Sequence, residues 1–487
     1  MQNKTILLGV LAVFVMFISH TSAYTPSASL QSKLERVVEK VEGVIDQRGE
    51  EYRLSFLVSI KKYQQKYSTN IAASYVLNYL FSEISQGESP NILLIIADDM
   101  GLDAMPGFSE GFEKPNIPNL ETLMSNGLTF ENMWSAPVCT PTRATILTGR
   151  YGVKTGVLKV DDELSIDETS LQSMLDNKTQ EGYNHAVIGK WHLSKDASHP
   201  TSMGVDYYAG LLTGGAKSYT NWRLTENSTT STNTEYITTK FTDLAIDWVS
   251  DQDEKPWFLW LAYTAPHTPF HLPPSDLHDR ELSGDQDDID NNPIPYYMAA
   301  IEAMDSEIGR LLDSIPQSEL DNTVIVFIGD NGTPGQAIQY PYSRKKAKGS
   351  LYQGGINVPM FVSGYGVDRQ GEREDTLVHT VDIFATVLDI ANTGVSKVND
   401  STSFKDFLTD ENTQQIEIVY GEVGTSGKKT GGYTIRDTEY KLIVFTDGQQ
   451  ELYNLVDDPY ENNNLARNNN YKDIISDLIS EADKIRK

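Results

Sequence analysis

The sequence predicts an α/β fold, with a large doubly wound mixed sheet flanked by helices, a smaller C-terminal antiparallel α+β subdomain and an N-terminal helical extension. From residue 90 onward, short apolar runs alternate with helical segments, which is the pattern of buried parallel strands joined by crossover helices. After residue 400, strand-like runs follow one another at hairpin spacing. Before residue 90, apolar residues instead recur at helical spacing.

Residues 1–23 have the features of a signal peptide. Lys4 supplies the positive charge, an apolar stretch follows from residue 6 to 18, and Ala23 ends a run of small residues that suits cleavage. The apolar stretch is short for a membrane span, so a retained N-terminal anchor is the less favoured alternative. We therefore expect an exported protein, periplasmic or extracellular.

Residues 24–89 form the expected helical extension. Leu30, Leu34, Val37 and Val41 follow helical spacing, and charged residues lie on the other faces. This pattern predicts a small helical hairpin or bundle. It is either a surface appendage that packs on the next domain or, as the less favoured alternative, a module for attachment to partners.

Residues 90–400 form the expected α/β domain. Buried strands are expected at 91–97, 185–188, 257–263, 324–328 and 359–362. Helices are expected between them, for example at 171–175, 240–249 and 298–315. The polar stretch at 226–233 is expected to be a loop.

Residues 401–487 form the expected C-terminal subdomain. Short strands are expected at 416–420, 433–436, 440–445 and 451–455, followed by a helix at 471–485. The short connections between these strands predict an antiparallel sheet.

The chain is strongly acidic, with a formal net charge of −28. Nucleic acid is therefore excluded as a partner, because phosphate binding needs a basic face. An anionic substrate would have to be held by a local basic pocket against an unfavourable overall field.

Cys139 is the only cysteine of the sequence, so it has no disulfide partner within the chain. Pro141 suits the first turn of a helix, which places the thiol at a helix N-terminus where free N–H groups favour an anion. Arg143 and Arg150 lie near one face of the same helix. We interpret Cys139 as a nucleophile that faces an anion site, rather than as a packing residue.

Acidic and amide side chains follow two of the expected strands. Asp98 and Asp99 come directly after the strand at 91–97, and Asp330 and Asn331 follow the strand at 324–328. In open α/β sheets, ligands bind at the carboxyl ends of strands. An oxygen-only ligand set suits a hard cation such as calcium or magnesium. Each pair taken alone could equally be a solvated turn or a helix cap.

Basic side chains also follow one expected strand and precede a glycine-rich run. The strand at 185–188 leads into a Gly-Lys-Trp-His-Leu string that contains Lys190 and His192, and Lys348 precedes a glycine-rich run. Taken singly, such residues are more often surface or core residues.

His267 follows the strand at 257–263. His271 lies four residues later and could suggest a zinc pair, but Pro269 between them argues against the continuous helix that such a pair needs.

The Cys-Thr-Pro-Thr-Arg run at 139–143, followed by Leu-Thr-Gly-Arg at 147–150, resembles the signature of the type I sulfatases of the alkaline phosphatase-like superfamily. The string at 189–193 is similar to their second signature, and the resemblance covers about residues 90–470. In that family the cysteine is oxidised to formylglycine, whose hydrate is the nucleophile. The resemblance therefore implies a formylglycine-generating maturation enzyme as a partner. The family most often has serine where this chain has Thr142.

The resemblance also implies a metal site and a sulfate site. The implied ligands of one divalent cation, usually calcium with magnesium as the alternative, are Asp98, Asp99, Cys139, Asp330 and Asn331. The residues implied to contact the sulfate are Arg143, Lys190, His267 and Lys348. Lys190 and His192, both in the second signature, are implied to contact the nucleophile and the sulfate.

One stretch departs from the family. After Lys348 the usual pattern is Glu-Gly-Gly-x-Arg, and this chain has Gln353 and Asn357 in place of the charged pair. These positions are not catalytic, but the replacement can alter the packing of the loop.

The implied activity is the hydrolysis of sulfate monoesters, on sulfated poly- or oligosaccharides or on aryl sulfates. Asp330 is the candidate acceptor of the proton of the nucleophile, His267 with Lys348 would protonate the leaving alcohol, and His192 would assist the release of sulfate.

Two alternatives stay open. The first is a phosphomonoester or phosphonate monoester hydrolase of the same superfamily, although eight histidines are few for a two-zinc phosphatase. The second is a non-catalytic carbohydrate-binding relative with an unmodified thiol. It is less favoured because a binding protein needs no acid for a leaving group.

Overall fold

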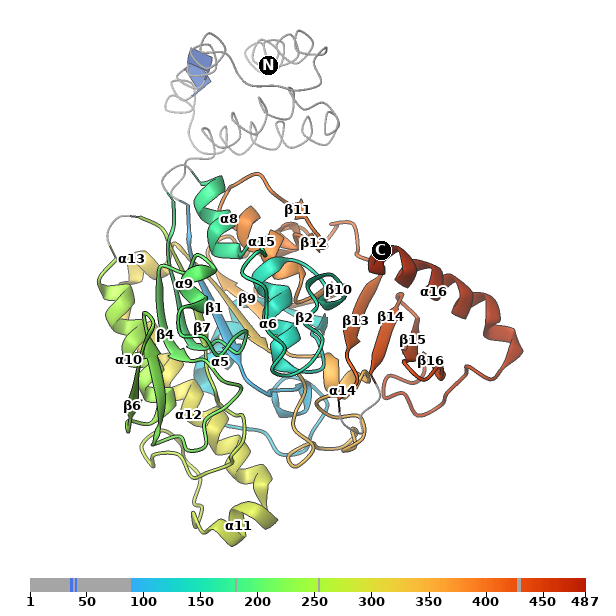
Figure 1. Cartoon of the computed structure of the whole chain (residues 1–487), viewed down its shortest axis with the longest axis horizontal. Helices are drawn as coiled ribbons and strands as arrows, with labels where there is room; N and C mark the ends of the chain where they lie inside the picture. Colours follow the sequence, from blue (N-terminus) through green and yellow to red (C-terminus); the bar gives the residue numbers. More distant parts are fainter. Residues whose placement is uncertain (1–35, 38–39, 42–88, 180–181, 253–254, 427–430) are drawn as a thin grey trace. The chain divides into compact units, whose positions relative to one another are not determined.

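The computed structural model describes residues 36–37, 40–41, 89–179, 182–252, 255–426 and 431–487 (Figure 1). One compact unit comprises Pro90–Leu388 with Ser396–Lys487, and a second comprises Met1–Ser89 with Asp389–Val395. The predicted signal peptide lies outside the described residues, and so does most of the predicted extension, of which residues 36–37 and 40–41 are helical. The predicted domain boundaries stay predictions.

A ten-stranded mixed sheet forms the centre of the larger unit, in the order β10-β2-β9-β8-β1-β7-β3-β4-β5-β6. Its strands are β1 (Asn91–Ala97), β2 (Gly127–Trp134), β3 (Asn184–Lys190), β4 (Tyr207–Leu211), β5 (Trp222–Glu226), β6 (Thr229–Asn233), β7 (Trp257–Ala262), β8 (Thr323–Gly329), β9 (Met360–Gly364) and β10 (Glu372–His379). β1 pairs in parallel with β7 and β8, and β3 pairs in parallel with β7. The predicted large mixed sheet is confirmed.

Helices connect the strands. They are η1 (Leu102–Ala104), α5 (Pro118–Ser125), α6 (Cys139–Thr148), α7 (Gly152–Thr155), α8 (Leu171–Lys178), α9 (His199–Ser202), α10 (Ile237–Ser250), α11 (Gln286–Asn291), α12 (Pro293–Ser314), α13 (Gln317–Leu320), α14 (Gln353–Ile356), α15 (Asp382–Ile390), η2 (Lys405–Leu408), η3 (Asn469–Tyr471) and α16 (Lys472–Arg486). No helix of the described residues is long and apolar enough to cross a bilayer.

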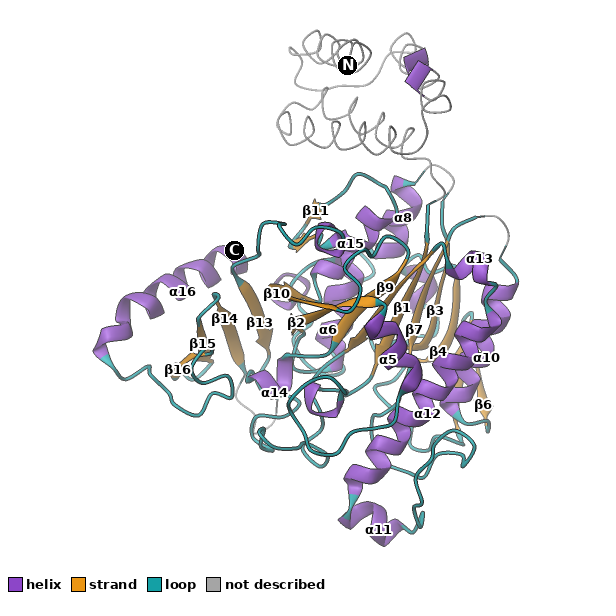
Figure 2. Ribbon diagram, turned by 180° about the vertical axis from the view of Figure 1, so that it is seen from behind, coloured by secondary structure: helices purple, strands orange, loops and turns teal. Residues whose placement is uncertain are grey.

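Helices lie on both faces of the sheet. Figures 1 and 2, viewed from opposite sides, show α6 and α8 in front of the sheet in one view and α5 and α12 in front of it in the other. Leu93 and Ile95 of β1 share a core cluster with Leu120 of α5 and Ile301 of α12. Every residue of β1, β7 and β8 is buried, because helices on both faces exclude water from these central strands.

The prediction of a polar loop at residues 226–233 is partly wrong. Residues 229–233 form β6, which pairs only with β5 at the edge of the sheet and is almost entirely exposed. An exposed edge strand has no apolar face to bury, and its threonines suit extended backbone, so a polar composition does not exclude a strand here.

The C-terminal part is a small antiparallel unit. Its sheet comprises β13 (Val419–Val423), β14 (Gly432–Arg436), β15 (Tyr440–Phe445) and β16 (Gln450–Asn454), each paired with the next. A separate hairpin consists of β11 (Lys397–Val398) and β12 (Ser401–Thr402). Ile475 and Leu478 of α16 pack with Leu442 and Leu452 of the sheet. The predicted antiparallel subdomain is confirmed.

Candidate active site

Two acidic turns lie side by side at the carboxyl edge of the sheet. The last residues of β1 and β8 are partners in the parallel pairing, so the turns that follow them start next to each other. The Asp99 N–H donates to Asp330 Oδ1 at 3.0 Å, and Asn331 Nδ2 donates to Asp99 Oδ1 at 2.8 Å. Asp98 completes this buried group. The register of two strands thus joins residues that are more than 200 positions apart.

The group fits a hard divalent cation. Asp98, Cys139 and Asp330 each offer a ligand atom, and these atoms lie within 4.8 Å of one another. Asp98 Oδ1 and Asn331 Oδ1 are buried and have no hydrogen-bond partner among the described residues. Buried acceptors without a donor are unfavourable in water-free surroundings, and a cation would satisfy both. Carboxylate and amide oxygens are the ligands that calcium and magnesium prefer.

Cys139 is the first residue of α6 and Val138 is its N-cap, so the thiol lies at a helix N-terminus as the sequence predicts. The helix ends at Gly149, whose φ of 62° gives the left-handed conformation that closes many helices. The thiol is buried, and its Sγ lies 3.2 Å from Nδ1 of His192.

Burial raises the pKa of the Cys139 thiol, although the charges of Lys190 and Lys348 act in the opposite direction. The thiol is therefore protonated at neutral pH. A protonated thiol is a poor nucleophile, so the unmodified side chain is badly suited to attack.

Three basic side chains each pair with one carboxylate. The pairs are Arg143 Nη2 with Asp330 Oδ2 at 2.9 Å, Lys190 Nζ with Asp98 Oδ2 at 2.6 Å, and Lys348 Nζ with Asp99 Oδ1. Burial disfavours ionised Asp98, but the surrounding cations, Lys190 foremost, hold its pKa well below the usual range. Burial and repulsion from Asp98 raise the pKa of Asp330 to about 7. The three cations thus offset the three carboxylates, so the site gathers buried positive charges in an acidic protein without a large net charge of its own.

His192 lies between Cys139 and the acidic Asp161. Its Nδ1 faces Cys139, and its Nε2 lies 3.0 Å from Asp161 Oδ1. Burial, followed by the charge of Lys190, lowers the pKa of His192 to about 3, so the ring is neutral. The Asp161 carboxylate accepts from Nε2–H, which leaves Nδ1 as the proton acceptor. The exposed Lys195 pairs with the other oxygen of Asp161 at 3.2 Å.

His267 reaches the same pocket from β7. Its Nε2 lies 3.6 Å from Asp99 Oδ2, and its Nδ1 donates to the Thr268 carbonyl oxygen at 2.7 Å. The Nε2 atom therefore faces the pocket. His271 lies elsewhere, with its Nε2 2.9 Å from the hydroxyl of Tyr236.

Gly214 and Gly215, which follow β4, lie against the rings of His192 and His267. A Cβ atom on Gly214 would lie 2.4 Å from the His192 ring, and one on Gly215 would lie 3.1 Å from the His267 ring. The hydroxyl of Tyr219, further along this segment, donates to the His267 carbonyl oxygen at 2.6 Å. The segment therefore holds both rings in place, and any larger side chain would displace them.

All residues predicted for the metal, the nucleophile and the sulfate meet at this edge of the sheet, and their roles stay predictions. Sequence reasoning missed Asp161, Gly214, Gly215 and Tyr219. Asp161 lies in a polar loop without a motif, and the signal for the glycine pair is only its place directly after a strand.

Family models match most of the chain. A model described as Sulfatase matches residues 90–393, and one described as N-sulphoglucosamine sulphohydrolase, C-terminal, matches residues 346–487.

The match to each of three relatives covers most of this chain and most of the relative. The chain is 26% identical to the uncharacterized sulfatase YdeN of Escherichia coli, over 82% of this chain and 86% of that protein. It is 25% identical to arylsulfatase G of Mus musculus, over 77% of this chain and 79% of that protein. It is also 25% identical to an ulvan-active sulfatase of Formosa agariphila, over 81% of this chain and 80% of that protein.

Solved structures share the fold. The crystal structure of Ps i-CgsB in complex with k-i-k-neocarrahexaose has a TM-score of 0.70 and 26% identity, and the match covers 82% of this chain and 93% of that one. A structure of BT4656 with D-glucosamine-2-N,6-O-disulfate has a TM-score of 0.67 and 20% identity, and the match covers 82% and 98% of the two chains. With a family model that covers more than half of its residues, the chain belongs to the sulfatase family of the alkaline phosphatase-like superfamily and is a sulfuric ester hydrolase.

Proposed function

We propose that this sulfatase hydrolyses sulfate monoesters of sulfated poly- or oligosaccharides through a formylglycine made from Cys139. The observation that carries the proposal is the position of Cys139 at the start of α6, against His192 and within the ring of paired charges. The ulvan-active relative and the neocarrahexaose complex support a glycan as substrate class. Aryl sulfates are the simpler alternative substrates.

The modification answers the chemical weakness of the thiol. The maturation enzyme would supply the oxidant and remove the sulfur, which converts the thiol-bearing carbon to an aldehyde. Addition of water to this aldehyde gives two hydroxyl groups on one carbon, in place of one protonated sulfur. One hydroxyl attacks the sulfur of the ester, and Asp330, whose oxygen lies close to the position of Sγ, takes its proton.

Asp98, Asp99, Asp330 and Asn331, with the modified Cys139, would hold one divalent cation, which we propose is calcium, with magnesium as the alternative. When bound, the cation supplies positive charge that stabilises the negative oxygens of the sulfate.

Basic residues of the chain carry the first half of the reaction. Arg143, Lys190 and Lys348 offset the charge of the sulfate oxygens as the bond to the alcohol breaks. His267 presents Nε2 toward the pocket and, with Lys348, gives a proton to the leaving alcohol.

His192 carries the second half. Its neutral Nδ1 takes the proton of the remaining hydroxyl, the carbon–oxygen double bond forms, and sulfate leaves with the electrons of the carbon–oxygen bond that breaks. Asp161 stabilises the ring once it is protonated. The aldehyde is regenerated without attack of water on a sulfated enzyme.

We also propose that the protein is exported, because residues 1–23 have the pattern of a cleaved signal and sulfated polysaccharides lie outside cells. A maturation enzyme would then have to act before export is complete.

The test combines mass and turnover. The peptide that contains residue 139, from protein made with a formylglycine-generating enzyme, should have the mass of an aldehyde in place of a thiol. The same protein should hydrolyse an aryl sulfate much faster than the matching aryl phosphate. An intact thiol in active protein would refute the nucleophile, and faster phosphate turnover would favour the phosphomonoester hydrolase.

A further inference from the structure

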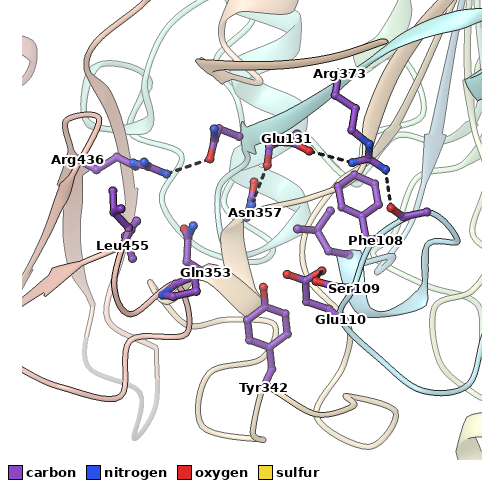
Figure 3. Close-up of a pocket in the computed structure, with 15 residues that line it drawn as sticks. Phe108, Ser109, Glu110, Glu131, Tyr342, Gln353, Asn357, Arg373, Arg436 and Leu455 are labelled. Carbon is purple, nitrogen blue, oxygen red and sulfur yellow. Dashed lines mark hydrogen bonds and ion pairs between the residues drawn. The ribbon is translucent and has the colours of Figure 1, made fainter. Parts of the chain in front are cut away.

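A second cavity lies outside the candidate active site (Figure 3). It has a volume of about 490 Å³, within the range of ligand pockets, and none of the residues assigned above to the reaction lines it. Its walls come from the loop after β1, from β2, α14 and β10, and from the C-terminal sheet. Both parts of the larger unit therefore contribute to it.

Two buried acceptors in the wall have no donor. Gln353 is 6% exposed and Asn357 is 7% exposed. Gln353 Oε1 and Asn357 Oδ1 have no hydrogen-bond partner within the described part of the chain. Asn357 Nδ2 donates to the Glu131 carbonyl oxygen at 3.1 Å, which fixes the orientation of that amide. Unsatisfied acceptors beside a cavity indicate a guest that donates hydrogen bonds.

The guanidinium of Arg436 and the hydroxyl of Tyr342 are donors in the wall of the same cavity. Arg436 is 6% exposed and forms no ion pair with a described carboxylate. Three of its N–H groups donate, to Asn132 Oδ1 at 3.0 Å and to the carbonyl oxygens of Asp437 and Thr438. Figure 3 shows Tyr342 and Gln353 pointing toward the row of residues that contains Arg436. Guanidinium has five N–H groups, so donors remain for a guest.

The wall contains two arginines, Arg373 and Arg436, and two carboxylates, Glu110 and Glu131. Burial lowers the pKa of Arg436 to about 10, although the charges of Asp437 and Glu461 act in the opposite direction, so the guanidinium stays charged at neutral pH. The other arginine of the wall, Arg373, is neutralised by Glu131 at 3.1 Å. Glu110 lies across the cavity from Arg436 (Figure 3), so an anionic group is attracted at the Arg436 end of the cavity and not at the Glu110 end.

We propose that this cavity binds one anionic sugar unit of a sulfated glycan, at a site separate from the reaction centre. The sugar hydroxyls donate to Gln353 Oε1 and Asn357 Oδ1, and the anionic group lies against Arg436. Leu455 and Phe108 supply the apolar contacts that a ring needs. The choice of a sulfated glycan rests on the proposed function, whereas the cavity and its donors and acceptors do not.

The test is glycan binding by protein with Cys139→Ala, in which no turnover takes place. The probes are hexasaccharides of carrageenan, ulvan and heparan sulfate, each with its desulfated form. We expect Asn357→Arg, and Gln353→Glu with Asn357→Arg, to weaken binding of a sulfated hexasaccharide at least tenfold by filling the cavity. The control Asn470→Arg adds the same charge at an exposed position and should leave the Kd unchanged.

A milder variant guards against misfolding. Tyr342→Phe removes one hydroxyl and should weaken binding severalfold, with an unchanged thermal unfolding midpoint. The desulfated probes should bind more weakly than the sulfated ones.

Each outcome is decisive. The proposal is overturned if no sulfated hexasaccharide binds, if Asn357→Arg and Tyr342→Phe leave the Kd unchanged, or if desulfation has no effect. Hydrolysis of a small aryl sulfate by the unsubstituted protein tests the proposed function separately. Turnover without cavity-dependent binding refutes only the second site, and cavity-dependent binding without turnover refutes only the proposed function.

Discussion

At the scale of single residues, the active site balances its charges before any ligand enters. Each of the three buried carboxylates has one basic partner, as in the pair of Lys190 with Asp98. A divalent cation would therefore leave the site with a net positive charge, which suits a sulfate monoester. Removal of one basic side chain would instead leave a buried carboxylate unpaired, which is costly.

The Cys139→Ser variant should react with one sulfate ester per enzyme molecule and then stay sulfated. Serine has one hydroxyl, so it can accept the sulfate but has no second hydroxyl to expel it. We expect one burst of alcohol from an aryl sulfate, equal to the enzyme present, and a fall in steady turnover of at least about 10³-fold. Rapid-mixing kinetics measures this, and Cys139→Ala, without any burst, is the control. Continued turnover by the serine variant would contradict the mechanism.

Asp161→Asn should slow the release of sulfate. The amide cannot stabilise protonated His192, so kcat should fall by about 10–100-fold while KM changes little. The matched control is Lys195→Ala, which removes the other partner of Asp161 and should leave kcat close to that of the unsubstituted enzyme. Equal losses in the two variants would assign Asp161 a merely structural role.

Site residues could be predicted from the sequence where they lie within a recognisable motif. Cys139, Lys190 and Asp330 were predicted to converge because each follows a strand or opens a helix within a recognisable string. Asp161 lies in a loop, and its role arises only from a contact with His192 across 31 positions. Such a contact leaves no pattern in a single sequence.

At the scale of elements, α6 must begin and end at fixed positions. Its first residue, Cys139, is the proposed nucleophile, and its end is set by Gly149, which has a φ of 62°. A Cβ atom there would lie 2.8 Å from the ring of Phe384. Both backbone conformation and packing therefore require glycine at this position.

Gly149→Ala should lower the free energy of unfolding by about 2–4 kcal/mol, through backbone strain and overpacking together. The matched control is Gly156→Ala, since Gly156 has a φ of 80° but open space around its Cβ position. There, strain alone should cost about 1 kcal/mol. Urea unfolding of both variants measures the difference, and equal losses would show that the Phe384 contact has no effect.

Elements were predicted unevenly. The fully buried strands β1, β7 and β8 are continuous apolar runs, so their positions follow from the sequence. The prediction did not include β2, in which glutamate and asparagine interrupt the apolar residues, or the exposed polar β6. Their strand character comes from pairing with neighbours that are distant in sequence.

At the scale of the whole molecule, buried ionisable groups couple stability to pH. Burial lowers the pKa of His379 to about 3. In the unfolded chain this histidine has a pKa of about 6.5, so below that pH it binds a proton that is not bound in the folded protein. Stability from this group is therefore complete above pH 6.5 and is lost as pH falls toward 3.

His379→Gln should make unfolding less sensitive to acid. Relative to the variant, the unsubstituted protein should lose about 2 kcal/mol of unfolding free energy between pH 7 and pH 5. Comparing the two proteins cancels Asp382, whose pKa burial raises to about 7 and whose effect on stability has the opposite sign. His278→Gln is the control for loss of a histidine. Parallel pH profiles for His379→Gln and the unsubstituted protein would contradict the prediction.

The burial of Cys139, which is only 2% exposed, sets an order of events in biosynthesis. The thiol emerges from the ribosome well before β8, which starts at Thr323 and supplies the opposite wall of its pocket. During that interval the segment around Cys139 is still an open peptide, because its distant partner strand has not been made. If Cys139 is oxidised as proposed, the maturation enzyme would have to recognise a linear stretch of newly made chain, before β8 pairs with β1.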